Sequence, residues 1–309
     1  MPSNVMQKTD FQEFFALGIT QVFEDRLKQQ EKTYSRWLRE ESVKRWKDTE
    51  QSVSGLGQMP EKNLGEVFSV DTISKGTQKD YELVAWGLAV TIEYEAMEWE
   101  IHGIFKGLGQ ELAKSAANRF IVTAYSLLNK AFSAAGDTNY QTFQSEDIID
   151  TAHTAIGGGT WSNRLTTNPG LAYLSIQDLI INMSRLTNER GFYDPAMPKT
   201  LATSVDNRFL AAEILESSAR PDQANPGVQN RLKGEGIQVH TSPYVTSATA
   251  WFLMGDKRDT RIKLRVGNLP TLRRDSDMRS LNLVMSCYTS FYLAVFDSRG
   301  WAGSDGTGV

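Results

Sequence analysis

A long stretch of helical periodicity near the middle of the chain constrains its fold more than any other feature. Between about residues 94 and 133, apolar side chains recur every three or four positions: Ile101, Ile104, Phe105, Leu108, Leu112, Ala116, Phe120, Ala124, Leu127 and Ala131. At about 1.5 Å per residue this helix would be roughly 60 Å long, which exceeds the width of a compact domain. Gly103, Gly107 and Gly109 each cost about 1 kcal/mol relative to alanine, so we expect a bend or a late start there. The pattern favours an extended molecule.

Strand-like alternation lies on both sides of this helix. Before it, the bulky residues Val84, Trp86, Leu88, Val90 and Ile92 alternate with small ones. After it, a second alternating region, around residues 281–295, would span roughly 50 Å, well over twice the usual strand length. Residues 261–266 alternate as well. Long strands beside a long helix indicate an α+β fold.

The N-terminal part, residues 10–50, is predicted to be helical in two sections. Phe11, Phe14, Phe15, Ile19, Val22, Phe23 and Leu27 form one apolar stripe, and Tyr34, Trp37, Leu38, Val43 and Trp46 continue it among charged residues. Two interpretations stay open for this segment. It is either a surface helix on its own domain or an arm that packs its aromatic side chains on a neighbouring subunit, because aromatic side chains are enriched at interfaces.

A hairpin is predicted between these helices. Glycines and a proline interrupt residues 51–65, and residues 66–74 then read as a first strand and residues 84–92 as a second. Residues 75–80, which include Lys75, Lys79 and Asp80, are expected to form its exposed, charged tip.

The rest of the chain mixes helices, loops and strands. Helices are predicted at residues 171–190 and 205–218, and strands at residues 237–240 and 250–253. Gly157, Gly158 and Gly159 are expected to form a flexible loop, because no strand with a phosphate-binding pattern precedes them. Residues 257–309 are expected to be β-structure.

Composition and motifs argue against an enzyme. Apolar residues make up 40% and charged residues 23% of the 309 residues, and the net charge is -4, which suits a soluble folded chain and not one that wraps nucleic acid. The single cysteine, Cys287, excludes an internal disulfide and is expected to be a buried small hydrophobe. No nucleotide-binding, zinc-protease or hydrolase motif is present. The sequence therefore predicts no catalytic, cofactor-binding or metal site, and no cofactor.

Two further features concern location and partners. The first fifteen residues carry charges and no apolar core of a signal peptide, and no apolar run is long enough to span a membrane. One basic cluster stands out, formed by Arg258, Arg261, Lys263, Arg265, Arg273 and Arg274. It is either a solvated strand face or a subunit interface that pairs with acidic residues.

The order of these elements resembles the major capsid protein of tailed bacteriophages, the Johnny fold, along nearly the whole chain. Residues 83–91 and the following Glu111-Leu112-Ala113-Lys114-Ser115-Ala116 resemble the return strand of the family's E-loop and its spine helix. Gly157-Gly158-Gly159-Thr160-Trp161-Ser162-Asn163 is similar to a segment of the family's axial domain. The ending Asp297-Ser298-Arg299-Gly300-Trp301-Ala302-Gly303-Ser304 resembles the family's closing Asp-x-Arg-Gly-x-x-Gly-Ser.

The resemblance implies a division of the chain. Residues 1–50 would form the N-terminal arm, 51–93 the E-loop hairpin and 94–136 the spine helix of the peripheral domain. Residues 137–256 would form the mixed α/β axial domain, and 257–309 the long strands of the peripheral domain and the C-terminus.

The resemblance also implies the function and the partners. Hexamers and pentamers would build an icosahedral shell around double-stranded DNA, without sequence-specific binding, in a virion assembled in the host cytoplasm. A separate scaffolding protein and a portal are expected partners, a decoration protein is a further one, and no membrane is involved. The residues expected to contact neighbouring subunits are Phe14, Phe15, Tyr34, Trp37, Trp46, Asp71, Lys75, Lys79, Asp80, Arg273 and Arg274. Some family members crosslink a hairpin lysine to an asparagine, but we predict no crosslink here because no partner asparagine or carboxylate can be matched.

Three alternatives are weaker. An encapsulin-like compartment would have the same fold around an enzyme cargo. A soluble enzyme with a dispersed site would form a compact oligomer with a polar pocket. A tail or decoration protein would leave the spine-length helix unexplained.

Overall fold

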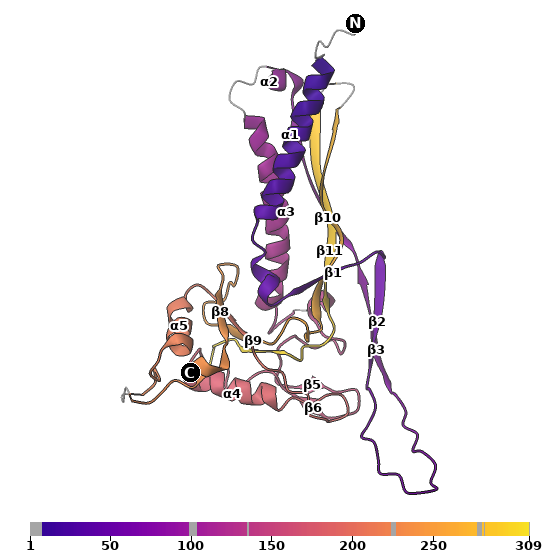
Figure 1. Ribbon diagram of the computed structural model, residues 1–309, viewed down its shortest axis with the longest axis vertical. Helices are drawn as coiled ribbons and strands as arrows, with labels where there is room; N and C mark the ends of the chain where they lie inside the picture. Colours follow the sequence, from indigo (N-terminus) through magenta and orange to yellow (C-terminus); the bar gives the residue numbers. More distant parts are fainter. Residues whose placement is uncertain are drawn as a thin grey trace.

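The computed structural model describes residues 8–98, 104–134, 136–223, 227–276, 280 and 282–308. Figure 1 shows a tall, narrow body built from two long helices and long strands, a smaller mixed region at its base, and a hairpin that projects sideways and downward. The predicted α+β class is confirmed, and the molecule is extended as the long periodicities indicate.

The tall body contains a four-stranded sheet in the order β1-β10-β11-β4. Its strands are β1 (Arg39–Ser42), β10 (Ile262–Ser276), β11 (Leu283–Val295) and β4 (Val84–Ile92). β1 runs parallel to β10, and the other two pairings are antiparallel. The register of β10 against β11 shifts on both sides of Asn268, which accommodates Pro270 because proline cannot donate to a sheet ladder. The predicted long strands are confirmed.

Two helices cover one face of this sheet, namely α1 (Lys8–Gln29) and α3 (Ile104–Asn129). The short α2 (Tyr94–Glu98) precedes α3, and α3 ends at Asn129, before the predicted end near residue 133. Gly107 and Gly109 lie within α3, and Gly103 lies outside the described residues. Ile19 and Phe23 of α1, Leu112 and Ala116 of α3, and Cys287 of β11 share one buried cluster. The predicted burial of Cys287 is confirmed, and burial raises the pKa of its thiol to about 11.

The chain between α1 and β2 differs from the predicted helix. A single 3-10 turn, η1 (Thr33–Arg36), leads into β1, and β2 (Lys47–Val53) follows. Tyr34 and Trp37 have relative exposures of 1% and 0%, and the Trp37 ring lies edge-on to Tyr125 and to Trp301. These two aromatic residues fill the chain's own core, so the prediction that they contact a neighbouring subunit is wrong.

The hairpin consists of β2 and β3 (Lys75–Glu82), which pair antiparallel from Lys47↔Glu82 to Val53↔Lys75. Its tip is the loop of residues 54–74 and not residues 75–80. The expected hairpin over residues 51–93 is therefore shifted, because β4 belongs to the main sheet and β2 supplies the first strand.

The base of the molecule holds a second sheet in the order β12-β9-β7-β8. These strands are β7 (Thr200–Thr203), β8 (Gln238–Thr241), β9 (Trp251–Met254) and β12 (Trp301–Ser304). Helices α4 (Tyr173–Ser184) and α5 (Arg208–Glu216) pack on it through a second core. β5 (His153–Thr154) and β6 (Thr160–Trp161) form a small hairpin around the predicted glycine loop, and 3-10 turns lie at η2 (Thr138–Tyr140) and η3 (Leu232–Glu235).

The last strand changes the expected division of the chain. β12 pairs with β9, so the C-terminal segment leaves the long strands and returns to the second sheet. The boundary at residue 257 therefore does not hold for residues 301–304, and Trp301 at the start of β12 packs against Trp37 beneath the main sheet. This contact between Trp301 and Trp37 joins the second sheet to the core of the main sheet.

Candidate assembly surfaces

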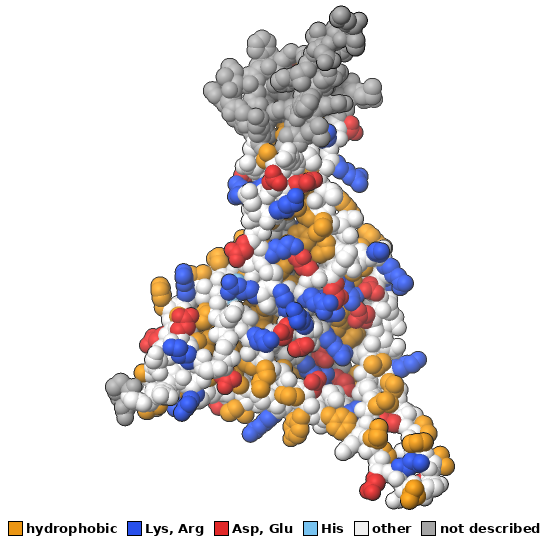
Figure 2. Space-filling view, in the orientation of Figure 1, with side chains coloured by type: hydrophobic (Ala, Val, Ile, Leu, Met, Phe, Trp, Pro, Cys, Tyr) orange, Lys and Arg blue, Asp and Glu red, His pale blue; other side chains and the backbone are white. Residues whose placement is uncertain are grey.

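The tip of the hairpin exposes apolar side chains that the described residues leave largely uncovered. Their relative exposures run from 55% to 106% and belong to Leu56, Met59, Leu64, Val67, Phe68, Val70 and Ile73. Figure 2 shows these side chains gathered at the end of the projecting hairpin. An isolated exposed leucine needs no explanation, but a cluster of this kind on a projecting loop marks a surface for another macromolecule.

An arginine fixes the base of the hairpin. The guanidinium of Arg265, on β10, donates hydrogen bonds to the carboxylates of Asp48 and Glu50 on β2 and lies 3.7 Å from Glu41 of β1. Its side chain is only 9% exposed. Lys263, two residues earlier on the same strand, pairs with Glu41 at 2.8 Å and helps to hold the pKa of that carboxyl below its usual value, against the opposing effect of burial. These pairs orient the hairpin relative to the main sheet.

A lysine and a tyrosine on β3 strengthen the same junction. The ammonium of Lys79 donates to the backbone oxygen of Gln141 at 2.5 Å, and the Tyr81 hydroxyl donates to that of Val295 at 2.5 Å. Burial lowers the pKa of Lys79 to about 8. The Tyr81 ring stacks on Tyr292 at 5.6 Å.

A second arginine holds the neck of the loop. Arg190 donates to the backbone oxygens of Gly55 and Thr72 and lies 3.4 Å from the Asp71 carboxylate. Hydrogen bonds from the backbone N–H groups of Gly57 and Thr72, with the Arg190 charge, lower the pKa of Asp71. We call Arg190 and these acceptors the neck clasp. Beyond it, the loop has few contacts with the rest of the chain.

The residues predicted to contact neighbouring subunits fall into different environments. Asp71 belongs to the neck clasp, and Lys75 and Asp80 are exposed on β3, where Asp80 pairs with Lys47 at 3.0 Å. Trp46 is 62% exposed just before β2. For these residues, intersubunit contact stays a prediction.

The remaining predicted contacts divide between helix and strand. Arg273 and Arg274 are exposed on β10 and form no ion pair with any described residue. Phe14 and Phe15 lie within α1, but their side chains are outside the described residues. The basic cluster thus splits, because Lys263 and Arg265 pair inside the chain while Arg273 and Arg274 stay open for a partner.

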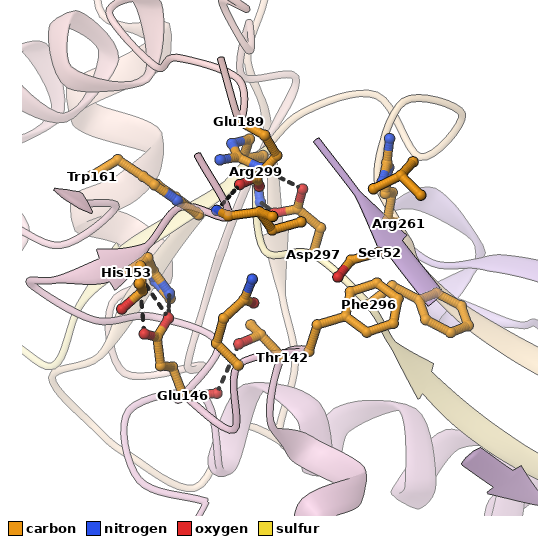
Figure 3. A pocket seen from close by; sticks show the side chains of 15 residues that line it. Ser52, Thr142, Glu146, His153, Trp161, Glu189, Arg261, Phe296, Asp297 and Arg299 are labelled. Carbon is orange, nitrogen blue, oxygen red and sulfur yellow. Dashed lines mark hydrogen bonds and ion pairs between the residues drawn. The ribbon is translucent and has the colours of Figure 1, made fainter. Parts of the chain in front are cut away.

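A cavity lies where the hairpin meets the second sheet. Its lining is polar, as in a catalytic or binding site, but it is too small to hold a substrate. Figure 3 shows Glu146, His153, Glu189, Asp297 and Arg299 around it. The residues are already paired, since Arg299 binds Glu189 at 2.6 Å and Asp297 at 2.8 Å, and Glu146 lies 3.2 Å from His153. Its volume is about 20 Å³, room for one water molecule and not for a substrate.

One functional candidate was not found from the sequence. The Arg119 guanidinium of α3 stacks on the Trp86 ring of β4 at 3.4 Å from its centroid, and its buried Nε has no hydrogen-bond partner among the described residues. Trp86 is part of the alternating pattern of β4. The sequence around Arg119, however, does not indicate which side chain its guanidinium contacts. The Arg119–Trp86 pair lies at the edge of the main sheet that is formed by β4.

Comparison with known proteins identifies the family. The sequence pattern of the phage capsid protein family matches residues 76–304, most of the chain. The chain belongs to the phage capsid protein family. No curated protein matches it by sequence.

Solved structures show the same fold at low identity. The capsid of the cyanophage P-SCSP1u has a TM-score of 0.60 and 8% identity, over 87% of this chain and 86% of that one. The capsid of Ralstonia phage GP4 has a TM-score of 0.56 and 11% identity, over 87% and 88%. The SrpI encapsulin complex from Synechococcus elongatus has a TM-score of 0.53 and 11% identity, over 90% and 89%.

The family decides between the alternatives raised by the sequence. The chain is a structural protein of a phage virion shell and not an enzyme, and its copies assemble into that shell. An encapsulin shares the fold, but the family match favours the phage capsid. Among the described residues no helix is long and apolar enough to span a membrane.

Proposed function

We propose that hexamers and pentamers of this chain close into an icosahedral shell that encloses the double-stranded DNA of a tailed phage. The observation that carries this proposal is the hairpin tip, where exposed apolar side chains lie on a loop that projects beyond β2 and β3. An exposed apolar cluster of this kind marks a surface that a neighbour covers. In a closed shell every subunit both presents and covers one tip, because heterologous contacts repeat around rotation axes.

The regions of the fold are assigned roles within this proposal. The main sheet with α1 and α3 acts as the peripheral domain, the second sheet with α4 and α5 as the axial domain, and the hairpin as the E-loop. Trp46, Lys75, Asp80, Arg273 and Arg274 contact neighbouring subunits. A net charge of -4 suits a wall that encloses DNA without holding it tightly.

Partners and location complete the proposal. A scaffolding protein, a portal and a decoration protein act with this chain, and assembly takes place in the host cytoplasm. We expect a shell without covalent crosslinks, since Lys79 is bound to backbone oxygens of its own chain. Intact monomer bands on a denaturing gel of mature particles would support this, and ladders of higher mass would contradict it.

Electron microscopy of the expressed chain, alone and with candidate scaffolding proteins, tests the function directly. Replacing residues 58–70 with a Gly-Ser linker of equal length removes the apolar tip and leaves the neck clasp in place. We expect a folded subunit with an unchanged melting temperature that forms no closed shells. Shells formed by the linker variant as readily as by the wild type would contradict the role of the tip.

A further inference from the structure

One leg of the hairpin loop has the sequence of a strand but no strand partner. Val67, Phe68 and Val70 favour strands, and side chains at 66, 68 and 70 share one face of an extended chain. Within the part of the chain that the structure describes, residues 67–70 form no hydrogen bond, and Val67 and Val70 are 91% and 88% exposed. We call residues 66–70 the free leg.

The opposite leg of the same loop cannot supply the missing ladder. Gly55 has a positive φ of 70°, which turns the chain out of the extended conformation just beyond β2. Pro60 has no backbone N–H to donate. The hairpin therefore stops pairing at the neck clasp, and the exposed backbone of the free leg is left to water, available to a strand from elsewhere.

The main sheet has an open edge that fits this need. Among the described residues β4 pairs only with β11, on one side. Val84 and Leu88 point toward the helix-covered face but are 44% and 50% exposed, since no strand lies beyond them. A long unpaired edge with apolar side chains is a template for strand addition by another chain.

Charge favours the same pairing. Arg119 lies beside this edge, stacked on Trp86, and forms no ion pair with any described residue. A carboxylate is the natural partner of an unpaired, half-buried guanidinium. The free leg carries Glu66 on the same face as Phe68 and Val70, and in its own chain Glu66 binds only Asn63 at the exposed surface.

We propose that the free leg of one copy adds as a fifth strand to the β4 edge of a neighbouring copy. In this arrangement Phe68 and Val70 cover Val84 and Leu88, and Glu66 pairs with Arg119 of the receiving copy. The pairing rests on the proposed shell and specifies how its subunits join.

A charge exchange tests the pairing. Glu66→Arg and Arg119→Glu, each alone, should lower the yield of closed particles at least tenfold, because like charges then meet across the new ladder. The double variant Glu66→Arg/Arg119→Glu should restore the yield. Glu61→Arg is the matched control, since it reverses an exposed carboxylate of the same loop outside the free leg, and should assemble as the wild type does. Single variants that assemble normally, or a folded double variant that stays as defective as the singles, would overturn the proposal.

Hydrogen exchange on the unmodified protein gives an independent readout. In assembled particles alternate amides of residues 67–70, whose N–H groups face β4 of the neighbour, should exchange at least tenfold more slowly than in free subunits, and alternate amides of β4 should slow with them. Particles in which residues 67–70 exchange as fast as in free subunits would refute strand addition and leave the capsid function intact. If the chain formed no particles under any condition, the proposed function itself would fail.

Discussion

The guanidinium of Arg265 donates a hydrogen bond to the carboxylate of Asp48, which lies 217 positions earlier in the sequence. The same guanidinium reaches Glu50, so a single side chain of the main sheet anchors the first strand of the hairpin at two points. The direction in which the hairpin leaves the body is therefore set by an ion-pair network, and the apolar tip beyond it is carried by a fixed base.

Replacing this arginine should loosen the hairpin base and destabilise the subunit. Arg265→Leu leaves the Glu50 carboxylate without its partner and the Asp48 carboxylate with only the Tyr292 hydroxyl, at a partly buried site, which we expect to lower the free energy of unfolding by about 2 kcal/mol. Arg261→Leu is the matched control, since Arg261 is exposed and forms no ion pair with the described residues. Denaturant titration of both variants measures the difference. Equal stabilities would show that the network contributes nothing.

Replacing two glycines of α3 by alanine should change the stability of the subunit in opposite directions. A Cβ at Gly109 would lie 2.8 Å from Cγ2 of Ile19, so α1 must shift, at about 1–3 kcal/mol. A Cβ at Gly107 meets nothing within 4 Å, so Gly107→Ala should stabilise the helix by about 0.5–1 kcal/mol. Thermal unfolding of Gly109→Ala and Gly107→Ala should give melting temperatures on opposite sides of the wild type. A gain in both variants would mean that α1 does not pack closely on α3.

The sequence predicts the elements whose patterns are local. The 3.6-residue period of α3 and the alternation of β4 and β11 describe each element's buried face directly, so these elements were predicted. The helices α4 and α5 have their own apolar faces and were found for the same reason. Their boundaries came out shorter than predicted, because periodicity does not show where a helix is capped.

The elements that were missed depend on partners far away in the sequence. The spacing of Tyr34 and Trp37 is that of a helix face. Their burial depends on residues far away in the sequence, such as Trp301, which lies in the same core cluster. The polar residues of β3 predict an exposed hairpin tip, whereas cross-strand pairs such as Thr49 with Asp80, at 2.7 Å, hold them in a strand. Arg190 gave no signal, since the neck clasp forms only after the hairpin and the second sheet have come together.

Stability should depend on pH through Lys79. Its folded pKa of about 8 lies below the usual value of 10.5, so the folded state releases the proton first as the pH rises. The cost of burying the charge is fully present below pH 8, and the stability attributable to this group should increase by up to about 3 kcal/mol between pH 8 and 10.5, since each pKa unit corresponds to about 1.4 kcal/mol. Lys79→Met should remove that increase, whereas Lys75→Met, on an exposed position of the same strand, should keep it. A steep increase that persists in Lys79→Met would assign it to another group.

The neck clasp should affect the mobility of the loop more than the stability of the subunit. Arg190→Ala removes bonds to Gly55, Asp71 and Thr72 at an exposed site, so the free energy of unfolding should change by no more than about 0.5 kcal/mol. The loop of residues 54–74 should become several times more sensitive to limited proteolysis. Assembly should slow, because a looser loop loses more conformational entropy when it docks on a neighbour.

Arg185→Ala is the control for this variant, since Arg185 is exposed at the end of α4. Light scattering follows the assembly rate, and a short protease digestion followed by mass spectrometry locates the cuts. If Arg190→Ala is cut and assembles like Arg185→Ala, the clasp does not hold the loop. A large loss of stability would instead mean that Arg190 supports the body of the subunit, since the loop itself has no core to lose.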